Sequence, residues 1–496
     1  MTMMKKINQI YVAGALALSL SMTSCENMLL NPVPESVLTS TNAFSNARDM
    51  ELGVYGIYSS LQSRVPSDFE LMEIPSDNMF GEYFANSPGM DAINTLDVTS
   101  SNLKINSFWK ACYNGIFRAN LILSKIDDPT DYAANKKEQL IGESKFLRAY
   151  FYFDLVRIFG GVPKVTEVLG ITAAANIGRA TEQEIYDFIV EDLTDAMSKL
   201  PKTAVQGRAT MGAAIALLAK VQVYRENWSA ARTLLERLNG SEFDYQLLPN
   251  YSSLFQIATE VNKEAIFSLA YVGGTNGHTL SYMLLPNGGV KGYSNGGSRV
   301  GRPTWDLHKT FDREDTRFKQ TITENALLWN STSESDAFWW PYFSKWMIPA
   351  EISNSSGLDI PLLRYADMVL LYAEVLHKMG ENDKALVELN KVRARAFKSD
   401  SHNYTAADVS TATAFMDKLL LERRLELAVE NNRWFDLVRT GRFVQVLQSV
   451  EGEYNPSTKQ AVMVVRNAKP FMKYFPIPFE QIQLAGKGVL TQNEGY

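Results

Sequence analysis

Three acidic side chains, Glu73, Asp77 and Glu82, lie close in sequence to several aromatic residues and are the first candidates for chemistry. A glycosidase needs two carboxylates that face a cleft at a fixed separation. Acids this close in sequence are also common on solvated loops, so their spacing does not favour catalysis. The four histidines are scattered, without the HExxH-like pairing of a metal hydrolase: His278, His308, His377 and His402. With no P-loop and no GxSxG elbow in the sequence, we expect no enzyme and no bound metal or cofactor.

Aromatic residues on loops indicate a different activity, the binding of sugars. Sugars present C–H faces to aromatic rings and hydroxyl groups to Asp, Asn and Arg, so a glycan site is an arc of exposed Tyr or Trp with polar neighbours. Three loop regions have this composition, at 77–84, 271–293 and 329–340. The candidate ligand-binding residues are Asp77, Asn78, Phe80, Tyr83, Phe84, Tyr282, Tyr293, Trp329 and Trp339. For each aromatic residue, the alternative is a buried packing role.

The elements that must position these loops are helices. Apolar residues recur at helical spacing around 108–126. A second helix is predicted from Lys136 to Phe159, where two glycines and Pro163 stop it. Similar patterns predict further helices over roughly 181–200, 210–226, 229–238, 362–379, 382–397 and 411–438. The sequence therefore predicts a mostly α-helical fold.

Two pairs of these helices have the plan of tetratricopeptide units, which are about 34 residues long. In 213–238 and in 363–396, small alanines lie where two helices would cross, and a short turn joins them. The five residues FDLVR also occur twice, at 153–157 and at 435–439. Their Asp and Arg stand three residues apart and can pair on one face of a helix. We interpret both copies as structural braces at the end of a long helix rather than as catalytic pairs.

The segment between about 240 and 360 departs from the helical pattern. Residues 287–301 contain six glycines in fifteen positions, a density that no regular element tolerates. Several tryptophans follow, and short β pieces are predicted at Glu264–Val272 and Ala461–Arg466. A helical scaffold that carries an aromatic, loop-rich insertion is a common way to build a binding surface. If a partner protein covers these aromatic residues, the chain is instead a pure scaffold.

The first residues have the features of a bacterial lipoprotein signal. Lys5 and Lys6 precede an apolar run from Tyr11 to Leu20, and small residues lead to Cys25. A cysteine at a new N-terminus can carry acyl chains, and several chains together anchor a protein stably to a membrane. We therefore predict that residues 1–24 are a signal peptide, that Cys25 is lipidated and that residues 25–40 are a tether.

Composition limits the remaining possibilities. Removal of residues 1–24 leaves 472 residues, which we assign to one domain over 41–496, with an N-terminal part of about 41–240 and a C-terminal part of about 260–496. The signal carries two lysines and no acid, so the net charge falls from −6 to −8, which argues against nucleic acid as a partner. No apolar run of about 18 residues follows the signal, so no transmembrane helix is predicted. With Cys25 lipidated, Cys112 has no intrachain disulfide partner.

Four segments in a fixed order resemble the SusD/RagB family of Bacteroidota outer-membrane lipoproteins. They are FLRAYFYFDLVRIFGGVP at 146–163, PLLRYADMVLLYAEVLHKMG at 361–380 followed by LNKVRARA, LLLERRLELAVENNRWFDLVR at 419–439, and the terminal YFPIPFEQIQ…LTQNEGY. The resemblance covers essentially the whole mature chain. It implies a SusD-like α-helical fold with four tetratricopeptide-like helix pairs on one convex side and a loop-rich insertion with a few short β-strands.

The resemblance also implies a function. Members of this family sit on the cell surface over a SusC-like TonB-dependent transporter, capture glycans and release them into the transporter. We therefore expect a lipid-anchored, surface-exposed glycan-binding protein of the outer membrane that has such a transporter as its partner. Binding of peptides or glycopeptides for the same type of transporter is the alternative, and an all-α glycosidase is a weaker one. Ligand residues cannot be transferred by motif within the family, so the candidates above rest on side-chain chemistry alone.

Overall fold

The computed structural model describes residues 44–81, 89–349, 354–455, 458–462 and 466–496. The predicted signal peptide, the predicted lipidation site Cys25 and the predicted tether lie outside the described residues, as do the candidate ligand residues Tyr83 and Phe84. Within the described ranges the chain is mostly α-helical, as predicted, and its strands are short.

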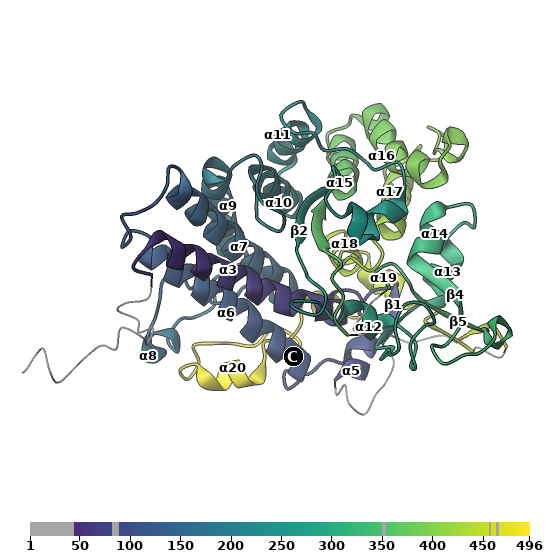
Figure 1. The fold of residues 1–496 in the computed structure, drawn as a ribbon, viewed down its shortest axis with the longest axis horizontal. Coiled ribbons are helices and arrows are strands. Elements are labelled where there is room, and N and C mark those ends of the chain that lie inside the picture. Colours follow the sequence, from purple (N-terminus) through teal and green to yellow (C-terminus); the bar gives the residue numbers. More distant parts are fainter. Residues whose placement is uncertain (1–43, 82–88, 350–353, 456–457, 463–465) are drawn as a thin grey trace, which may run out of the picture.

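The first half of the chain is built from packed helices, and α3, α6, α7 and α9 lie on the left of Figure 1. These are α3 Ala47–Arg64, α4 Phe69–Met72, α5 Met90–Thr95, α6 Leu103–Lys125, α7 Lys136–Phe159, α8 Ile171–Ala174, α9 Glu182–Lys199, α10 Met211–Tyr224 and α11 Trp228–Asn239. Helix α3 packs against α6, α7 against α9 and α10 against α11. Helix α7 is buried on all sides over its last nine residues, and Gly160, with φ 71°, ends it in a conformation that favours glycine.

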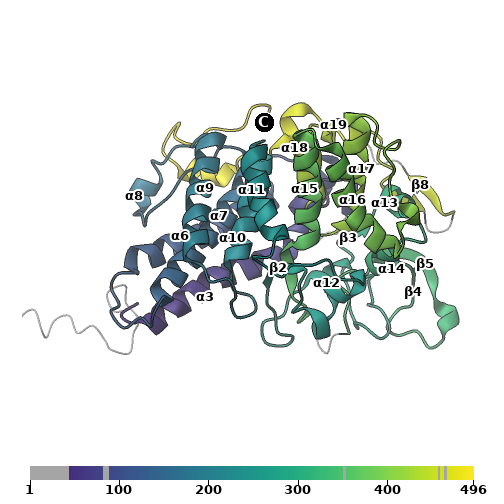
Figure 2. The same ribbon diagram turned by 90° about the horizontal axis from the view of Figure 1, so that it is seen from above.

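The C-terminal helices continue this array. They are α15 Tyr365–Lys378, α16 Asn382–Phe397, α17 Ala412–Glu426, α18 Arg433–Arg439, α19 Phe443–Leu447 and α20 Phe479–Leu484. Helix α11 contacts α15, and α17 packs on both α15 and α16, so these helices stand side by side in Figure 2. The two predicted tetratricopeptide-like units are confirmed as the pairs α10–α11 and α15–α16.

The insertion lies between α11 and α15 and holds α12 Leu280–Leu284, α13 Trp305–Thr310 and α14 Thr316–Thr321. Its strands, together with those of flanking segments, form two-stranded antiparallel sheets that pair β1 with β3, β2 with β6, β4 with β5 and β7 with β8. The strands are β1 Met79–Gly81, β2 Ala265–Leu269, β3 Gly301–Pro303, β4 Ile322–Ala326, β5 Phe338–Phe343, β6 Ile360–Arg364, β7 Glu453–Asn455 and β8 Gln460–Val462. Figure 2 shows β2 to β5 along the lower edge of the helical array.

One predicted element is wrong. The sequence predicts a single helix over 411–438, but the structure has two, α17 and α18, with a turn over Leu427–Asn432 between them. Val429 and Asn431 in this turn have φ values of 62° and 60°, which no helix contains. The turn has no glycine or proline, so the break comes from tertiary contacts and not from a local stop signal.

A buried network of ion pairs joins the insertion to the C-terminal helices. Arg364 Nη1 lies 2.9 Å from Glu264 Oε1 and 2.6 Å from Glu426 Oε1. Arg395 Nη2 and Arg317 Nη1 also bond Glu426, at 2.5 and 3.1 Å. All five side chains are buried. Burial alone would raise the pKa of Glu426, but the three guanidinium groups hold it well below its usual value.

The two copies of FDLVR form the predicted Asp–Arg pairs and also meet one another. Arg157 pairs with Asp154, and Arg439 pairs with Asp436 at 2.8 Å. The Arg157 guanidinium also lies 4.0 Å from the ring centroid of Phe435 in the other copy. An arginine over an aromatic ring is an attractive contact. The motif therefore links α7 to α18, which the sequence did not predict.

Cys112 lies inside α6 and is fully buried. Burial raises the pKa of its thiol well above the usual value, so the neutral form persists. Across the part of the chain that the structure describes, no helix combines the length and the apolar character that a bilayer crossing requires.

Candidate functional site

Strand β5 places aromatic residues on two faces of the β4–β5 hairpin, because successive side chains of a strand point to opposite sides. Phe338, which is 41% exposed, and Trp340 stand on one face, with ring centroids 6.2 Å apart. Trp339 points to the other face, where its ring meets Trp305 edge-on at 5.8 Å. Trp329, between the two strands, is 47% exposed. The candidates Trp329 and Trp339 therefore share a hairpin, but Trp339 does not share the face of Trp340.

The glycine-rich loop packs on the Trp340 side of this hairpin. The backbone N–H of Lys291 donates to the carbonyl of Leu327 at 2.9 Å. Tyr293 packs together with Trp340 against a small apolar cluster. At Gly289, with φ 72°, a Cβ would lie 2.1 Å from a backbone oxygen of the same loop, so only glycine fits there. We call Tyr293, Phe338 and Trp340 the aromatic platform.

Tyr282 lies on α12 Leu280–Leu284, next to the glycine-rich loop that carries Tyr293. Its carbonyl accepts a hydrogen bond from the backbone of Ser298 at 2.8 Å, and its side chain is half-buried. The fold thus brings Tyr282, from a region that the sequence singled out, next to the segment that precedes β3.

Arg302 on β3 supports the platform from behind. Its guanidinium lies 4.0 Å from the ring centroid of Trp340 and 5.2 Å from that of Phe80 on β1. Arg299 lies 5.5 Å from the Trp340 ring. Arg302 is buried and holds the Trp340 ring in place, whereas Arg299 is half-buried at the edge of the platform. The sequence analysis missed both arginines, although the segment SRVGR directly precedes the tryptophan-rich part.

Three candidates from the first loop region are not exposed. Asp77, Asn78 and Phe80 are at most 2% exposed, so the expected surface role for them is corrected. Asp77 accepts hydrogen bonds from Arg433 at 2.7 and 2.8 Å and pairs with Arg424 at 3.2 Å. Burial alone would raise the pKa of Asp77, but these two arginines hold it well below its usual value. The sequence offered one signal, which is that buried arginines in the 419–439 segment need acidic partners.

A polar groove of about 550 Å³ opens beside Asp77, between α13, α17, α18 and α19. Its charged side chains pair with one another, as in the 2.8 Å contact between Arg424 and Asp306. No aromatic residue occurs among the described residues that line it. The groove therefore lacks a ring on which a sugar face could stack.

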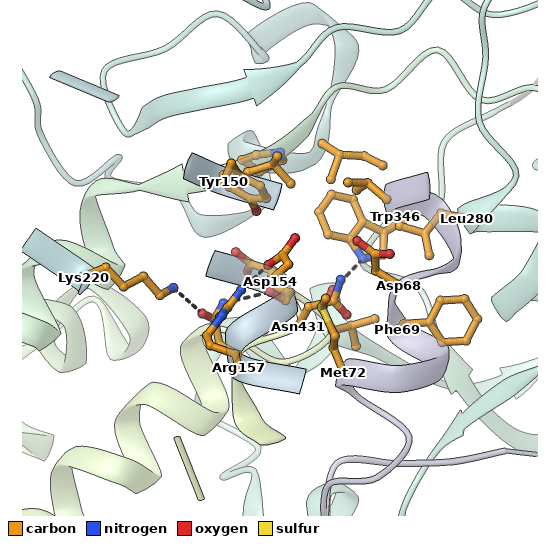
Figure 3. A pocket seen from close by; sticks show the side chains of 17 residues that line it. Asp68, Phe69, Met72, Tyr150, Asp154, Arg157, Lys220, Leu280, Trp346 and Asn431 are labelled. Carbon is orange, nitrogen blue, oxygen red and sulfur yellow. Dashed lines mark hydrogen bonds and ion pairs between the residues drawn. The ribbon is translucent and has the colours of Figure 1, made fainter. Parts of the chain in front are cut away.

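A smaller, partly open pocket of about 50 Å³ lies where α4, α7 and α10 meet the α17–α18 turn (Figure 3). Asp68, Asp154, Arg157 and Lys220 line it together with residues 429–432. The volume suits a few water molecules and is too small for a sugar ring. Burial raises the pKa of Asp68 to about 7, although Arg64 lies 3.3 Å away and opposes this shift.

Glu73 is a second buried carboxyl at this junction. Its Oε1 accepts hydrogen bonds from the backbone N–H of Val429 and from Asn78 Nδ2, both at 2.8 Å. Its Oε2 is buried and has no hydrogen-bond partner among the described residues. Burial raises the pKa of Glu73 to about 7. Asp77 borders the polar groove but Glu73 does not line it, so these two acids do not face one cleft as a glycosidase pair would.

The raised pKa of Glu73 predicts a pH dependence of stability. The folded pKa of about 7 lies above the usual 4.5, so the stability that Glu73 contributes at low pH is lost as the pH rises through 7. Glu73→Gln does not titrate and keeps an acceptor for Val429. We expect this variant to gain about 3 kcal/mol relative to the natural protein between pH 4.5 and pH 8. Urea unfolding at a series of pH values measures this gain.

The exposed residue Glu334 supplies the control for this experiment. Glu334→Gln, in the loop between β4 and β5, should give a stability curve parallel to that of the natural protein. A curve for Glu73→Gln that also runs parallel would contradict the burial argument.

Metal binding has no support in the described ranges, where no three His, Cys, Asp or Glu side chains are grouped to hold an ion. Two histidines of the insertion are buried. His278 hydrogen-bonds the carbonyl of Leu358 at 2.9 Å, and burial lowers its pKa to about 4. His308 stacks on Trp305 at 4.7 Å. Their contacts are those of packed core residues.

Comparison with known proteins gives consistent matches along the chain. A family model described as "SusD family" matches residues 263–496, and one described as "Starch-binding associating with outer membrane" matches residues 49–223. SusD-like protein P38 of Formosa agariphila is 28% identical over 493 residues, covering 90% of this chain and 95% of that protein.

Solved structures have the same fold. A laminarin-binding SusD-like protein superimposes with a TM-score of 0.76 at 25% identity, covering 91% of this chain and all of that one. A SusD-like protein from Bacteroides fragilis gives a TM-score of 0.79 at 23% identity, covering 94% of this chain and all of that one. Together with the mostly helical fold and the order of the four motifs, these matches show that the chain belongs to the SusD/RagB family.

Proposed function

We propose that this protein captures oligo- or polysaccharide at the bacterial surface and delivers it to a SusC-like TonB-dependent transporter in the outer membrane. The aromatic platform, with Trp329 nearby on the hairpin, is the proposed ligand site. Trp339 and Tyr282 stay predicted contacts at its margins. Tyr83 and Phe84 also stay predictions.

One observation carries the glycan assignment, which is that the platform combines a partly exposed ring with a polar side chain beside it. Phe338 is 41% exposed, and the half-buried Arg299 lies 5.5 Å from the ring centroid of Trp340. A sugar can stack its C–H face on such a ring while its hydroxyls bond the flanking polar groups. The 25% identical relative that is named for laminarin binding supports a carbohydrate ligand.

The proposed activity is binding without catalysis. Glu73 and Asp77, two of the acids that the sequence singled out, are buried, and Asp77 is held between two arginines. A modest affinity suits the role, since the ligand must leave for the transporter after capture concentrates it at the surface. The partner transporter and the delivery step rest on the family.

Native gels that contain plant and host polysaccharides test the proposal with the mature chain without its lipid. We expect one class of glycan to retard the protein, and Tyr293→Ala to restore its mobility. If no glycan retards it while peptides or glycopeptides bind, the alternative ligand class holds. If a glycan binds and is cleaved, the glycosidase alternative holds.

Lipidation of Cys25 is proposed as the membrane anchor, together with removal of residues 1–24. Cys25→Ser is expected to move the protein from the membrane fraction to the soluble fraction, because acyl chains supply the anchoring energy. Fractionation of cells followed by immunoblotting measures this change. Cys112→Ser, which alters a buried thiol, is the matched control and should still pellet. Pelleting of both variants would refute the anchor.

A further inference from the structure

The turn between α17 and α18 holds strained backbone at the centre of the molecule. Val429 and Asn431 adopt left-handed conformations, with φ values of 62° and 60°. This region is unfavourable for residues with a Cβ and most unusual for a β-branched one. Such strain persists only where surrounding contacts force it, and it concentrates at functional elements.

The first set of contacts comes from the residues that directly follow β5. Lys345 Nζ donates to the carbonyl of Ala428 at 2.7 Å, and Trp346 Nε1 donates to the carbonyl of Val429 at 3.1 Å. Both side chains are buried. Strand β5 carries Phe338 and Trp340. These two platform residues are therefore connected to the turn through the few residues that follow β5.

The second set comes from the residues that precede β1. Glu73 accepts the backbone N–H of Val429 and the side-chain amide of Asn78, each at 2.8 Å. The carbonyl of Asn78 accepts the backbone N–H of Thr304, which follows β3, at 3.0 Å. The paired strands β1 and β3 carry Phe80 and Arg302, which support Trp340 from behind. The same turn is therefore connected to β5 through Lys345 and Trp346, and to the β1–β3 pair through Glu73 and Asn78.

The turn also has room to move. The 50 Å³ pocket borders residues 429–432, as Figure 3 shows for Asn431. Asn431 Oδ1 is buried without a hydrogen-bond partner among the described residues. Asp68 and Lys220 border the same pocket. A shift of this turn would close a void instead of forcing atoms together, so packing opposes it less than elsewhere in the core.

We propose that the Leu427–Asn432 turn is a positioning element for the ligand site, with Val429 as its central residue. The strained turn sets the spacing between β5 and the β1–β3 pair, and so the geometry of the platform. Relaxation of the turn shifts the population away from the spacing that binds the ligand. This inference rests on the proposed glycan-binding function, and Val429 itself does not touch the ligand.

Val429→Gly tests the inference, because glycine adopts this φ without strain and leaves the turn free to take other backbone conformations. The measurements are glycan affinity by isothermal titration calorimetry and hydrogen exchange of the β5 amides in the ligand-free protein. We expect about fivefold weaker binding, the lower end of typical coupling between distant sites. We also expect faster exchange in β5.

Lys398→Gly supplies the matched control. Lys398 has a left-handed φ of 52° at the exposed C-terminal end of α16, outside the Leu427–Asn432 turn. This substitution relieves the same kind of strain, so it should change neither affinity nor β5 exchange. A purely structural role for Val429 would change the melting temperature of Val429→Gly and leave its affinity equal to that of the control.

The outcomes separate the inference from the proposed function. If the natural protein binds no glycan, the proposed function fails, and β5 exchange alone decides whether the turn positions the strand. If it binds and Val429→Gly matches Lys398→Gly in affinity and exchange, the positioning role is overturned. Should Val429→Gly fail to fold, Trp346→Phe removes the hydrogen bond to Val429, together with part of a buried ring, and is judged by the same two measurements.

Discussion

Replacing Glu426 by alanine is expected to lower the free energy of unfolding by about 3–5 kcal/mol, because it leaves buried charges without their partner. The Glu426 carboxylate contacts Arg364, Arg395 and Arg317. All three arginines are buried, so water cannot take the place of the carboxylate. Chemical denaturation followed by circular dichroism measures the loss.

A surface ion pair provides the comparison for this prediction. Asp187→Ala removes a carboxylate that pairs with Arg225 at 2.6 Å and whose side chain is 56% exposed. Exposed pairs contribute at most about 1 kcal/mol. If Glu426→Ala costs no more than Asp187→Ala, the buried network does not hold the insertion against the C-terminal helices.

The second large effect concerns ligand affinity. Phe338→Ala is expected to weaken glycan binding about 30-fold, or ~2 kcal/mol, the size of effect seen when a central aromatic contact is truncated. Phe338 is partly exposed, so its removal should leave the free energy of unfolding nearly unchanged. Titration calorimetry with the glycan identified by native gels measures the affinity.

Two further variants sharpen this experiment. Phe479→Ala removes a phenylalanine of similar exposure, 49%, from α20 and should bind normally. Trp339→Ala alters the opposite face of the hairpin, next to Trp305. If Trp339→Ala abolishes binding while Phe338→Ala does not, the ligand uses the Trp305 face, and the platform assignment is wrong.

Helices with strong local signals could be predicted closely from the sequence. The bounds of α7 match the prediction because Gly160 and Gly161 stop the helix, and those of α16 match because its apolar pattern is regular. The break between α17 and α18 could not be predicted, since the residues LAVENN contain no helix stop. Contacts from Glu73, Lys345 and Trp346, far away in the sequence, impose it.

The grouping of aromatic residues on the insertion could be predicted by region but not by residue. Aromatic residues of the insertion do gather on one hairpin, and Tyr293 packs against it as a glycine-rich loop allows. Asp77 and Asn78 have the composition of a binding loop, yet partners from α17 and α18 bury them. Composition alone cannot distinguish an exposed acid from one that neutralises a buried arginine. Only the fold brings Arg302 to Trp340.

The buried position of Cys112 makes the chain convenient for site-specific labelling. Labelling requires an accessible thiolate, which attacks the reagent as a nucleophile, whereas the Cys112 thiol is buried and burial raises its pKa. A recombinant chain that starts after Cys25 therefore needs no cysteine removed before a new one is introduced. Glu334→Cys would place a single reactive thiol on the exposed loop between β4 and β5. A fluorophore attached there would report directly on events at the hairpin, in real time and in a mixture of glycans.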